Sequence, residues 1–276
     1  MRGKLAAFWR LSRAEHGVMT AIAVLAGAVS AGGVPWWRVL LGVSSAFLIE
    51  VFLFVTNDIL NLEEDRVNSP WRPLVRGEVS VKEAWAFALA SLVLGVLLTA
   101  PLGVWALAII FLAAALGFLY NWRLKRMGLI GNAVVAFLTA LAFFYGGIGV
   151  SGVISDKIIL FTAIAFTANV GRELAKGVID VEGDAAAGVA TVAVIFGRRA
   201  AAALAAVFML AAVAMSPLGL FYVNNKALYG VLIGVTDMLF VYSAVLLAAR
   251  PRVGEARRVR TATLVGMALA IIAFMA

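Results

Sequence analysis

Nine stretches of mostly apolar residues, each about as long as a membrane-spanning helix, run through the chain. An α-helix needs about 20 such residues to cross the hydrocarbon core of a bilayer. Hydrophobic residues make up 64% of the 276 residues and charged residues 14%, whereas soluble domains average about 45–50% and about 25%. This composition excludes a soluble enzyme, a disordered chain and a nucleic-acid-binding module. We therefore expect an all-α membrane protein with a single transmembrane domain over residues 1–276, whose spans lie at residues 16–34, 37–60, 82–100, 102–121, 129–150, 157–179, 198–216, 227–249 and 258–275.

The Lys and Arg residues fall almost entirely on one side of these predicted spans. Of the 23 in the chain, only Arg38, Lys157 and Lys226 lie on the other side. Cytoplasmic loops carry the excess of Lys and Arg in membrane proteins. We therefore expect a multi-pass protein of the cell membrane with its N-terminus in the cytoplasm and its C-terminus outside.

Most Asp and Glu residues gather on the same predicted cytoplasmic side as the basic residues. Cap loops are expected there at about residues 61–82, 121–129 and 180–198. We expect the loops at 61–82 and 180–198 to be mobile lids when no substrate is bound. Because charge of both signs is concentrated on this face, it is where we expect the active site.

The first acidic motif follows the second span and contains Asn57, Asp58, Asn61 and Asp65. Residues seven apart return to nearly the same face of a helix, so Asp58 and Asp65 should point the same way, with Asn61 between them. Mg²⁺ takes one or two carboxylates and completes its shell with water and substrate phosphates. This spacing favours a magnesium site.

The second acidic motif follows the sixth span, where Asp180 and Asp184 are one helical turn apart. Lys176 lies one turn earlier and Arg172 one turn before that. A pair of solvated loop carboxylates balanced by nearby Arg residues is the simpler interpretation of one such motif. Two motifs at matching places favour bound metal instead, because carboxylates that share a face repel one another.

The two motifs each follow the second helix of a group of four, which suggests an internal repeat. Spans one to four and five to eight then form two four-helix repeats, and the ninth helix stands outside them. Functional sites of membrane proteins often lie at the interface between such repeats.

Together these motifs resemble those of the UbiA superfamily of intramembrane prenyltransferases. That family has nine helices, an N-D-x-x-D-x-x-x-D motif after helix two and a D-x-x-D-x-x-x-D-type motif after helix six. The chain departs from the pattern at Asn61 and Gly177, where the family usually has Asp. It matches the pattern at Asn57, Asp58, Asp65, Asp180 and Asp184, while residues 68–74 resemble the N-x-x-x-R-P continuation and residues 120–125 the basic cap after helix four.

The resemblance implies transfer of a prenyl group from its diphosphate, with Mg²⁺ as cofactor and a lipid-like acceptor. Residues 122–132 and 172–184 are most similar to the branch of the family that adds a geranylgeranyl group to geranylgeranylglyceryl phosphate in archaeal ether-lipid synthesis. The implied metal ligands are Asp58, Asn61, Asp65, Asp180 and Asp184; the implied catalytic residues are Asp58, Asp65, Asp180 and Asp184 with Tyr120 and Lys125; and the implied substrate-binding residues are Asn57, Asn61, Arg72, Arg123, Arg172 and Lys176.

Two acidic residues, Glu50 and Asp237, lie inside predicted spans. Ionisable groups at membrane depth are costly and usually functional. Glu50 shares the helix face of Asn57, so it is a candidate for binding or deprotonating the acceptor. A neutral, hydrogen-bonded packing role is equally open for both residues.

Two alternatives stay open from the sequence. One is a UbiA-type aromatic prenyltransferase that acts on 4-hydroxybenzoate or a quinone precursor. The other is a secondary transporter, although transporter sites lie near the membrane midplane and these motifs lie at its edge. The expected partners are a prenyl diphosphate, a lipid-like acceptor and membrane lipid, with no nucleic acid and no obligatory protein partner.

Overall fold

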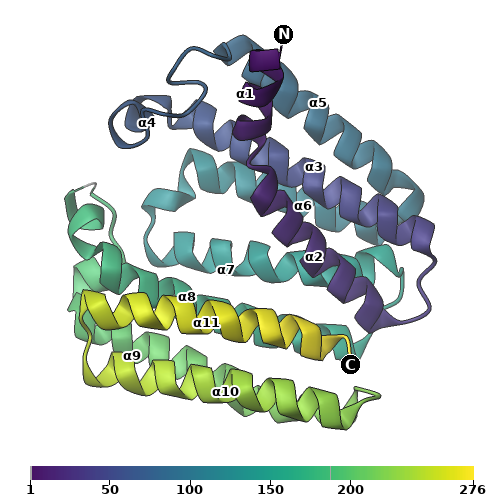
Figure 1. Ribbon diagram of the computed structural model, residues 1–276, viewed down its shortest axis with the longest axis vertical. Helices are drawn as coiled ribbons and strands as arrows, with labels where there is room; N and C mark the ends of the chain where they lie inside the picture. Colours follow the sequence, from purple (N-terminus) through teal and green to yellow (C-terminus); the bar gives the residue numbers. More distant parts are fainter. Residues whose placement is uncertain (1, 187) are drawn as a thin grey trace.

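The chain is helical throughout, and the computed structural model describes residues 2–186 and 188–276, over which it contains no β-strand (Figure 1). The N-terminal half comprises α1 (Arg2–Ser12), α2 (Ala14–Ala31), α3 (Trp36–Leu60), α4 (Leu62–Asn68), α5 (Val81–Thr99), the short 3₁₀ helix η1 (Ala100–Leu102), α6 (Val104–Trp122) and the 3₁₀ helix η2 (Leu124–Arg126). The C-terminal half comprises α7 (Leu129–Phe144), the π-helical turn η3 (Tyr145–Val150), α8 (Asp156–Ala186), α9 (Val192–Met215), the 3₁₀ helix η4 (Ser216–Phe221), α10 (Lys226–Ala249) and α11 (Val253–Phe274).

Eight helical segments of the described chain are long and apolar enough to cross a membrane. They correspond to the first eight predicted spans and identify an integral membrane protein. The ninth predicted span is the 22-residue helix α11. Its first turns carry Arg257, Arg258 and Arg260, so its composition does not place it among the eight.

Buried apolar side chains form two clusters, one in each half of the chain. Val55 and Ile109 lie in the cluster built on α1–α6, whereas Phe161 and Met209 lie in the cluster built on α7–α11. In Figure 1 the two groups of helices lie one above the other, with α7 between them. The two clusters fall on either side of the predicted boundary between spans four and five, but α11 packs in the second cluster, whereas the sequence analysis placed the ninth helix outside both units.

The segments expected to be cap loops are partly helical, which corrects the sequence prediction. Residues 62–68 form α4, and α8 continues as a regular helix to Ala186 instead of ending near residue 179. The next long helix begins at Val192, where the Thr191 hydroxyl accepts a hydrogen bond from the Val194 N–H. Asp180 and Asp184 therefore lie on an ordered helix, and only a short connection, part of it outside the described residues, joins α8 to α9.

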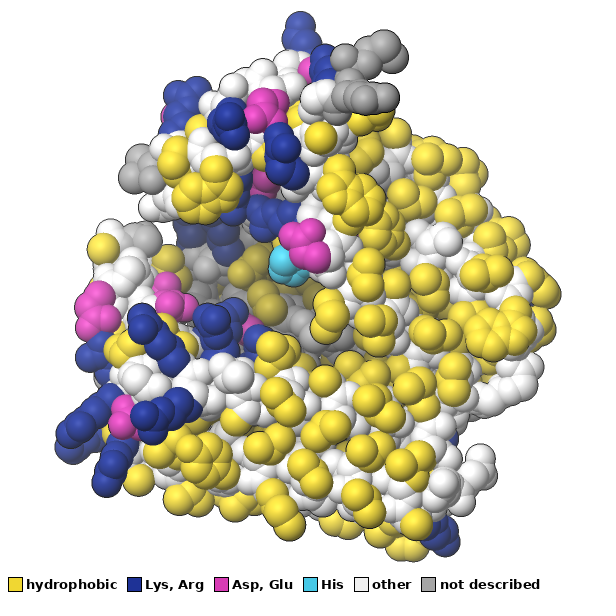
Figure 2. Space-filling model, viewed as in Figure 1, with side chains coloured by type: hydrophobic (Ala, Val, Ile, Leu, Met, Phe, Trp, Pro, Cys, Tyr) yellow, Lys and Arg dark blue, Asp and Glu magenta, His cyan; other side chains and the backbone are white. Residues whose placement is uncertain are grey.

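The outer surface separates sharply into an apolar part and a charged end. Figure 2 shows apolar side chains covering most of the visible face, while Lys, Arg, Asp and Glu gather at the left around a hollow between the two halves. Figure 1 shows the last turns of α3 and α8 and the first turns of α11 at that end. The large exposed apolar side chains, such as Leu94, Phe111 and Val241, are those expected to face lipid.

Candidate active site

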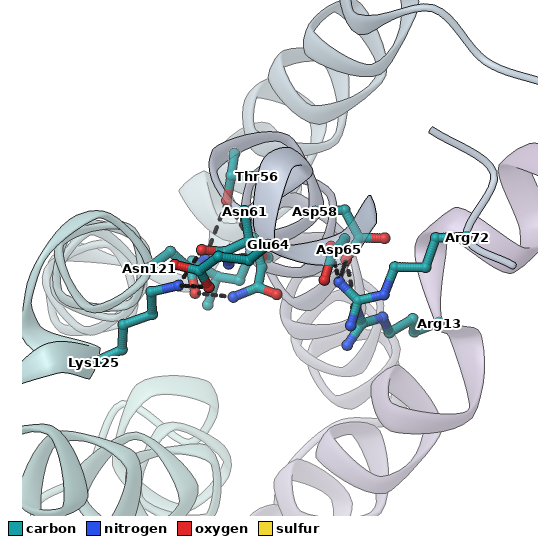
Figure 3. Close-up of polar contacts among 11 residues, drawn as sticks. Arg13, Thr56, Asp58, Asn61, Glu64, Asp65, Arg72, Asn121 and Lys125 are labelled. Carbon is teal, nitrogen blue, oxygen red and sulfur yellow. Dashed lines mark hydrogen bonds and ion pairs between the residues drawn. The ribbon is translucent and has the colours of Figure 1, made fainter. Parts of the chain in front are cut away.

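The end of α3 brings the two aspartates of the first motif onto one side, as their spacing predicts. Arg72 Nη1 lies 3.1 Å from Asp58 Oδ1 and also forms an ion pair with Asp65 (Figure 3). Arg13, at the turn between α1 and α2, forms a second ion pair with Asp58. Asp58 is only 2% exposed and Asp65 6%. Two buried carboxylates thus converge on a single guanidinium nitrogen.

The asparagines of the same motif face the other way, toward α6 and η2. Asn57 Nδ2 donates a hydrogen bond of 2.9 Å to Asn121 Oδ1, and Asn61 Oδ1 accepts one from Lys125 Nζ. Figure 3 shows Asn61 and Lys125 on the opposite side of the helix from Asp58 and Arg72. Asn61 therefore does not lie between the two aspartates as the sequence predicted.

Lys125 is held at this place by Glu64 on α4. Lys125 Nζ lies 2.9 Å from Glu64 Oε2, and Arg126 Nη2 lies 2.6 Å from Glu64 Oε1. The hydrogen bond from Lys125, strengthened by that from Arg126, lowers the pKa of Glu64 below its ordinary value. The carboxylate thus stays charged at neutral pH and fixes both basic side chains at the end of α6.

The second acidic motif lies on the last two turns of α8. Asp180 is exposed and Asp184 half-buried, and the two carboxylates repel one another. No ion pair to either is found within the described part of the chain. The aspartates of the first motif are therefore paired with arginine, whereas those on α8 form no such ion pair and Lys176 acts on Asp184 only through space.

Basic residues precede this acidic pair on the same face of α8. Lys176 Nζ donates hydrogen bonds of 3.1 and 2.9 Å to the two oxygens of Glu173. Arg172 Nη1 lies 3.5 Å from Glu173 Oε1. Glu173 is 6% exposed, so one buried carboxylate orders both cations.

One residue of α6, Tyr120, is influenced by the charges on α8. The Tyr120 hydroxyl on α6 lies within electrostatic reach of Glu173 and Asp184 on α8. Over the residues that the structure describes, no three His, Cys, Asp or Glu side chains are grouped closely enough to hold a metal ion. The four predicted ligands Asp58, Asp65, Asp180 and Asp184 thus form two separate pairs.

The remaining predicted residues are more scattered. Glu50 lines a mainly apolar cavity between α2, α3, α6 and α7, together with Thr20 and Tyr145. Arg123 is exposed at the end of α6. Asp237 on α10 accepts a hydrogen bond of 2.6 Å from Ser216, a partner that the sequence did not indicate.

Three residues that contribute to the site were not predicted: Arg13, Glu64 and Glu173. Arg13 lies 45 residues before its partner Asp58, and Glu64 lies 61 residues before Lys125. No periodicity in a sequence links positions so far apart. For Glu173 a signal was present, because its carboxylate stands next to Arg172 and three residues before Lys176.

Comparison with known proteins identifies the family to which these motifs belong. The model of the UbiA prenyltransferase family matches residues 18–272. The chain belongs to the UbiA prenyltransferase family. It is therefore a membrane prenyltransferase. The resemblance to the UbiA superfamily that the motifs indicated is confirmed.

Similar proteins cover the whole of this UbiA family member. Digeranylgeranylglyceryl phosphate synthase of Archaeoglobus fulgidus is 37% identical over 280 residues, which span 99% of this chain and 95% of that protein. A solved structure from work on digeranylgeranylglyceryl phosphate synthase in membranes has a TM-score of 0.88 and 29% identity, and the match covers 100% of this chain and 98% of that one. A UbiA homologue from Archaeoglobus fulgidus bound to GPP and Mg²⁺ has a TM-score of 0.69 at 20% identity, covering 98% and 100% of the two chains. At that identity the likeness is one of fold.

Proposed function

We propose that this enzyme transfers a geranylgeranyl group from geranylgeranyl diphosphate to a hydroxyl of geranylgeranylglyceryl phosphate, in archaeal ether-lipid synthesis. The observation that carries the proposal is the similarity to the Archaeoglobus fulgidus synthase over 99% of this chain. The acceptor oxygen forms a bond to C1 of the prenyl group, and the bond from C1 to the diphosphate oxygen breaks. The diphosphate leaves with the electron pair, and the hydroxyl proton passes either to Glu50 or directly to the departing diphosphate.

The two carboxylate pairs fit Mg²⁺ as the cofactor. Asp58 and Asp65 converge on one nitrogen of Arg72, so a positive charge is held where their oxygens meet. Asp180 and Asp184 present two carboxylates, which are ligands of the kind that Mg²⁺ prefers. We infer that these four aspartates hold the metal, whereas Asn61, which accepts a hydrogen bond from Lys125 on the other side of the helix, does not join them. When bound, Mg²⁺ neutralises the charge that develops on the departing diphosphate.

The basic residues around the hollow supply donors for phosphate oxygens. Arg13, Arg72 and Lys125 surround the first acidic motif. Arginine binds phosphate through a planar fork and lysine as a point charge. We infer that Arg72 and Lys125 bind the diphosphate of the donor, that Tyr120 and Asn57 line its binding site, and that Arg123 contributes positive potential at the rim.

The apolar cavity between the helices supports a dry reaction site. Allylic cations react with water, so the prenyl group must be shielded while the diphosphate departs. Ile110, Leu138 and Leu141 line the cavity below the site together with Glu50. The cavity is small, about 50 Å³, so we infer that its apolar lining faces the prenyl chain without enclosing it, and that Glu50 orients or deprotonates the acceptor.

We further propose nine spans in the cell membrane, an N-terminus in the cytoplasm and an active site that faces the cytoplasm. The contacts of α11 support the ninth span. The backbone N–H groups of Asn224 and Asn225, at the start of α10, donate hydrogen bonds of 3.2 Å to the Ala276 carbonyl. Helix α11 begins beside the end of α10 and finishes beside its start. It therefore runs antiparallel to α10 and extends across the same thickness of the membrane.

The decisive experiment supplies radiolabelled geranylgeranyl diphosphate to the purified protein. Geranylgeranylglyceryl phosphate and 4-hydroxybenzoate are offered in parallel, each with Mg²⁺ or with EDTA. We expect an ether product only from the glyceryl phosphate and only with Mg²⁺. In the double variant Asp65→Ala, Asp184→Ala we expect at least a hundred-fold loss, because electrostatic stabilisation contributes about that much or more.

Other outcomes lead to other functions. Product only from 4-hydroxybenzoate would assign the chain to the aromatic branch of the family. Absence of transfer to either acceptor by a folded protein would contradict the proposed reaction. Product formation that is unchanged in EDTA would contradict the role of Mg²⁺.

A further inference from the structure

One cluster on α8 has not yet been assigned to either of the two substrates. Arg172, Glu173 and Lys176 lie about one to two turns before the exposed Asp180 on α8, and Glu173 is within electrostatic reach of Tyr120 on α6. The three side chains carry two positive charges and one negative charge. Because Glu173 is buried and hydrogen-bonded to Lys176 through both oxygens, the two cations are fixed in place and keep a net charge of one.

Arg172 has a hydrogen-bond donor, its Nε–H, for which no described residue supplies an acceptor. Its Nε is one of only three buried side-chain nitrogen and oxygen atoms without a hydrogen-bond partner among the described residues. A buried donor without an acceptor costs about 1–3 kcal/mol, and more when it is charged. The side chains of Arg172 and Lys176 are 21% and 36% exposed, so a ligand in the hollow can reach both.

The proposed reaction brings two anionic substrates together, and they need separate counter-charges. Arg13, Arg72 and Lys125 lie in the N-terminal half and are engaged with the first acidic motif. Arg172 and Lys176 lie in the C-terminal half, on the helix that Tyr120 faces. A phosphate monoester carries about two negative charges near neutral pH, fewer than a diphosphate, so the small net positive charge of this cluster suits the monoester better.

We propose that Arg172 and Lys176 bind the phosphate monoester headgroup of the acceptor lipid, and that Glu173 is a positioning residue that holds them. This inference rests on the proposed function. A glycerol hydroxyl lies only a few bonds from its phosphate. Fixing the phosphate on α8 therefore limits where the hydroxyl can lie relative to the prenyl diphosphate across the hollow.

The test separates the two substrates by steady-state kinetics. For Lys176→Met and Arg172→Met we expect the KM for geranylgeranylglyceryl phosphate to rise at least ten-fold, while the KM for geranylgeranyl diphosphate changes less than two-fold. Lys125→Met should do the reverse and raise the KM for the donor. Lys226→Met removes an exposed lysine at the start of α10, at the opposite end of the helices from the site, and should leave both values unchanged.

A neutral acceptor isolates the phosphate contact. Geranylgeranylglycerol lacks the phosphate, so wild type and Lys176→Met should use it at equal rates. Lys176→Arg should restore most of the acceptor KM. Glu173→Gln should raise the acceptor KM three-fold or more and leave the donor KM unchanged, whereas loss of a purely structural residue would lower kcat for both acceptors alike.

Each outcome bears on a different claim. A donor KM that rises in Lys176→Met or Arg172→Met, with an unchanged acceptor KM, would assign these residues to the diphosphate and overturn the inference. Equal losses with the neutral acceptor would overturn it as well. Wild type that makes no product from geranylgeranylglyceryl phosphate would remove the proposed function and this inference together. A monodisperse elution profile in detergent establishes that each variant is folded.

Discussion

Arg13 shows how a single residue connects the start of the chain to the site. It has a φ of 46°, and it is the only residue other than glycine with a positive φ in the described chain. A left-handed backbone costs a residue with a Cβ roughly 1–2 kcal/mol. Its side chain offsets this cost, because the guanidinium pairs with Asp58 and lies 4.9 Å from the centre of the Phe54 ring. The strain is therefore retained at a place where the side chain neutralises a buried carboxylate.

Removing the arginines should destabilise the protein unequally. Arg72 serves two buried carboxylates and Arg13 serves one. We expect Arg72→Ala to cost about 3–5 kcal/mol, the usual cost of leaving a buried charge unpaired, and Arg13→Ala about 1–3 kcal/mol. Together they should cost more than the sum, because Asp58 then has neither partner. Thermal unfolding in detergent, followed by circular dichroism, measures these differences.

A rescue experiment identifies the cause of this loss. Adding Asp58→Asn and Asp65→Asn to the double variant removes the uncompensated charges and should recover much of the lost stability. If the neutral asparagines recover nothing, the arginines stabilise the fold by packing and not by charge.

At the scale of elements, helix α2 packs so closely against α7 and η3 that the backbones touch. A Cβ on Gly27 would lie 2.1 Å from the Phe143 carbonyl oxygen, and one on Gly146 would lie 1.9 Å from the Val24 carbonyl oxygen. Small residues at such crossings allow close helix packing in membranes. Since α2 lies in the N-terminal half and α7 in the C-terminal half, these glycines join the two cores.

Alanine at these glycines should force the helices apart. We expect Gly27→Ala and Gly146→Ala each to lower the unfolding temperature in detergent by several degrees, because the obstructing atoms are backbone and cannot rotate away. Gly234→Ala is the matched control. A Cβ there would meet nothing within 4 Å, and alanine is the better helix former by about 1 kcal/mol, so this variant should be neutral or stabilising. Equal effects at all three positions would contradict a close crossing.

The lengths and positions of the membrane-spanning helices could be predicted because the thickness of the bilayer sets the length of each apolar stretch. The sequence located eight spans because each must bury a long apolar stretch, and the spacing of Asp58 and Asp65 predicted their common side. It did not reveal α1, a short helix with Lys4 and Arg10. The sequence also did not predict the extension of α8, because the charges and the glycine within residues 180–186 are typical of a loop. The pairing of Glu64 with Lys125 depends on how α4 packs near η2. The sequence of neighbouring residues does not determine that packing.

On the scale of the whole molecule, the two ends of the chain's membrane domain meet. Ser30 Oγ, near the end of α2, donates a hydrogen bond of 2.6 Å to the Phe274 carbonyl at the end of α11. Phe274 also stacks on Phe161 of α8, with ring centroids 4.1 Å apart. Helix α11 is therefore packed into the domain along its length, although its first turns carry several arginines. These contacts support the proposed ninth span.

The number and direction of the spans can be tested cleanly because the chain has no cysteine. Single cysteines are introduced at Lys226, Arg257 and Ala276, and intact cells are treated with a membrane-impermeant maleimide. The proposed topology places positions 226 and 276 outside and position 257 in the cytoplasm. We therefore expect Lys226→Cys and Ala276→Cys to be labelled in intact cells, and Arg257→Cys to be labelled only after permeabilisation.

The pattern of labelling distinguishes the two claims in this topology. Protection of Ala276→Cys together with labelling of Lys226→Cys would show that α11 does not cross, and the domain would then have eight spans. Inversion of the whole pattern would keep nine spans but place the site on the outer face, where the Lys and Arg excess is not expected. The cysteine-free parent gives the background. Because Asn224 and Asn225 contact Ala276 directly, positions 226 and 276 should be labelled or protected together if this packing holds in the membrane.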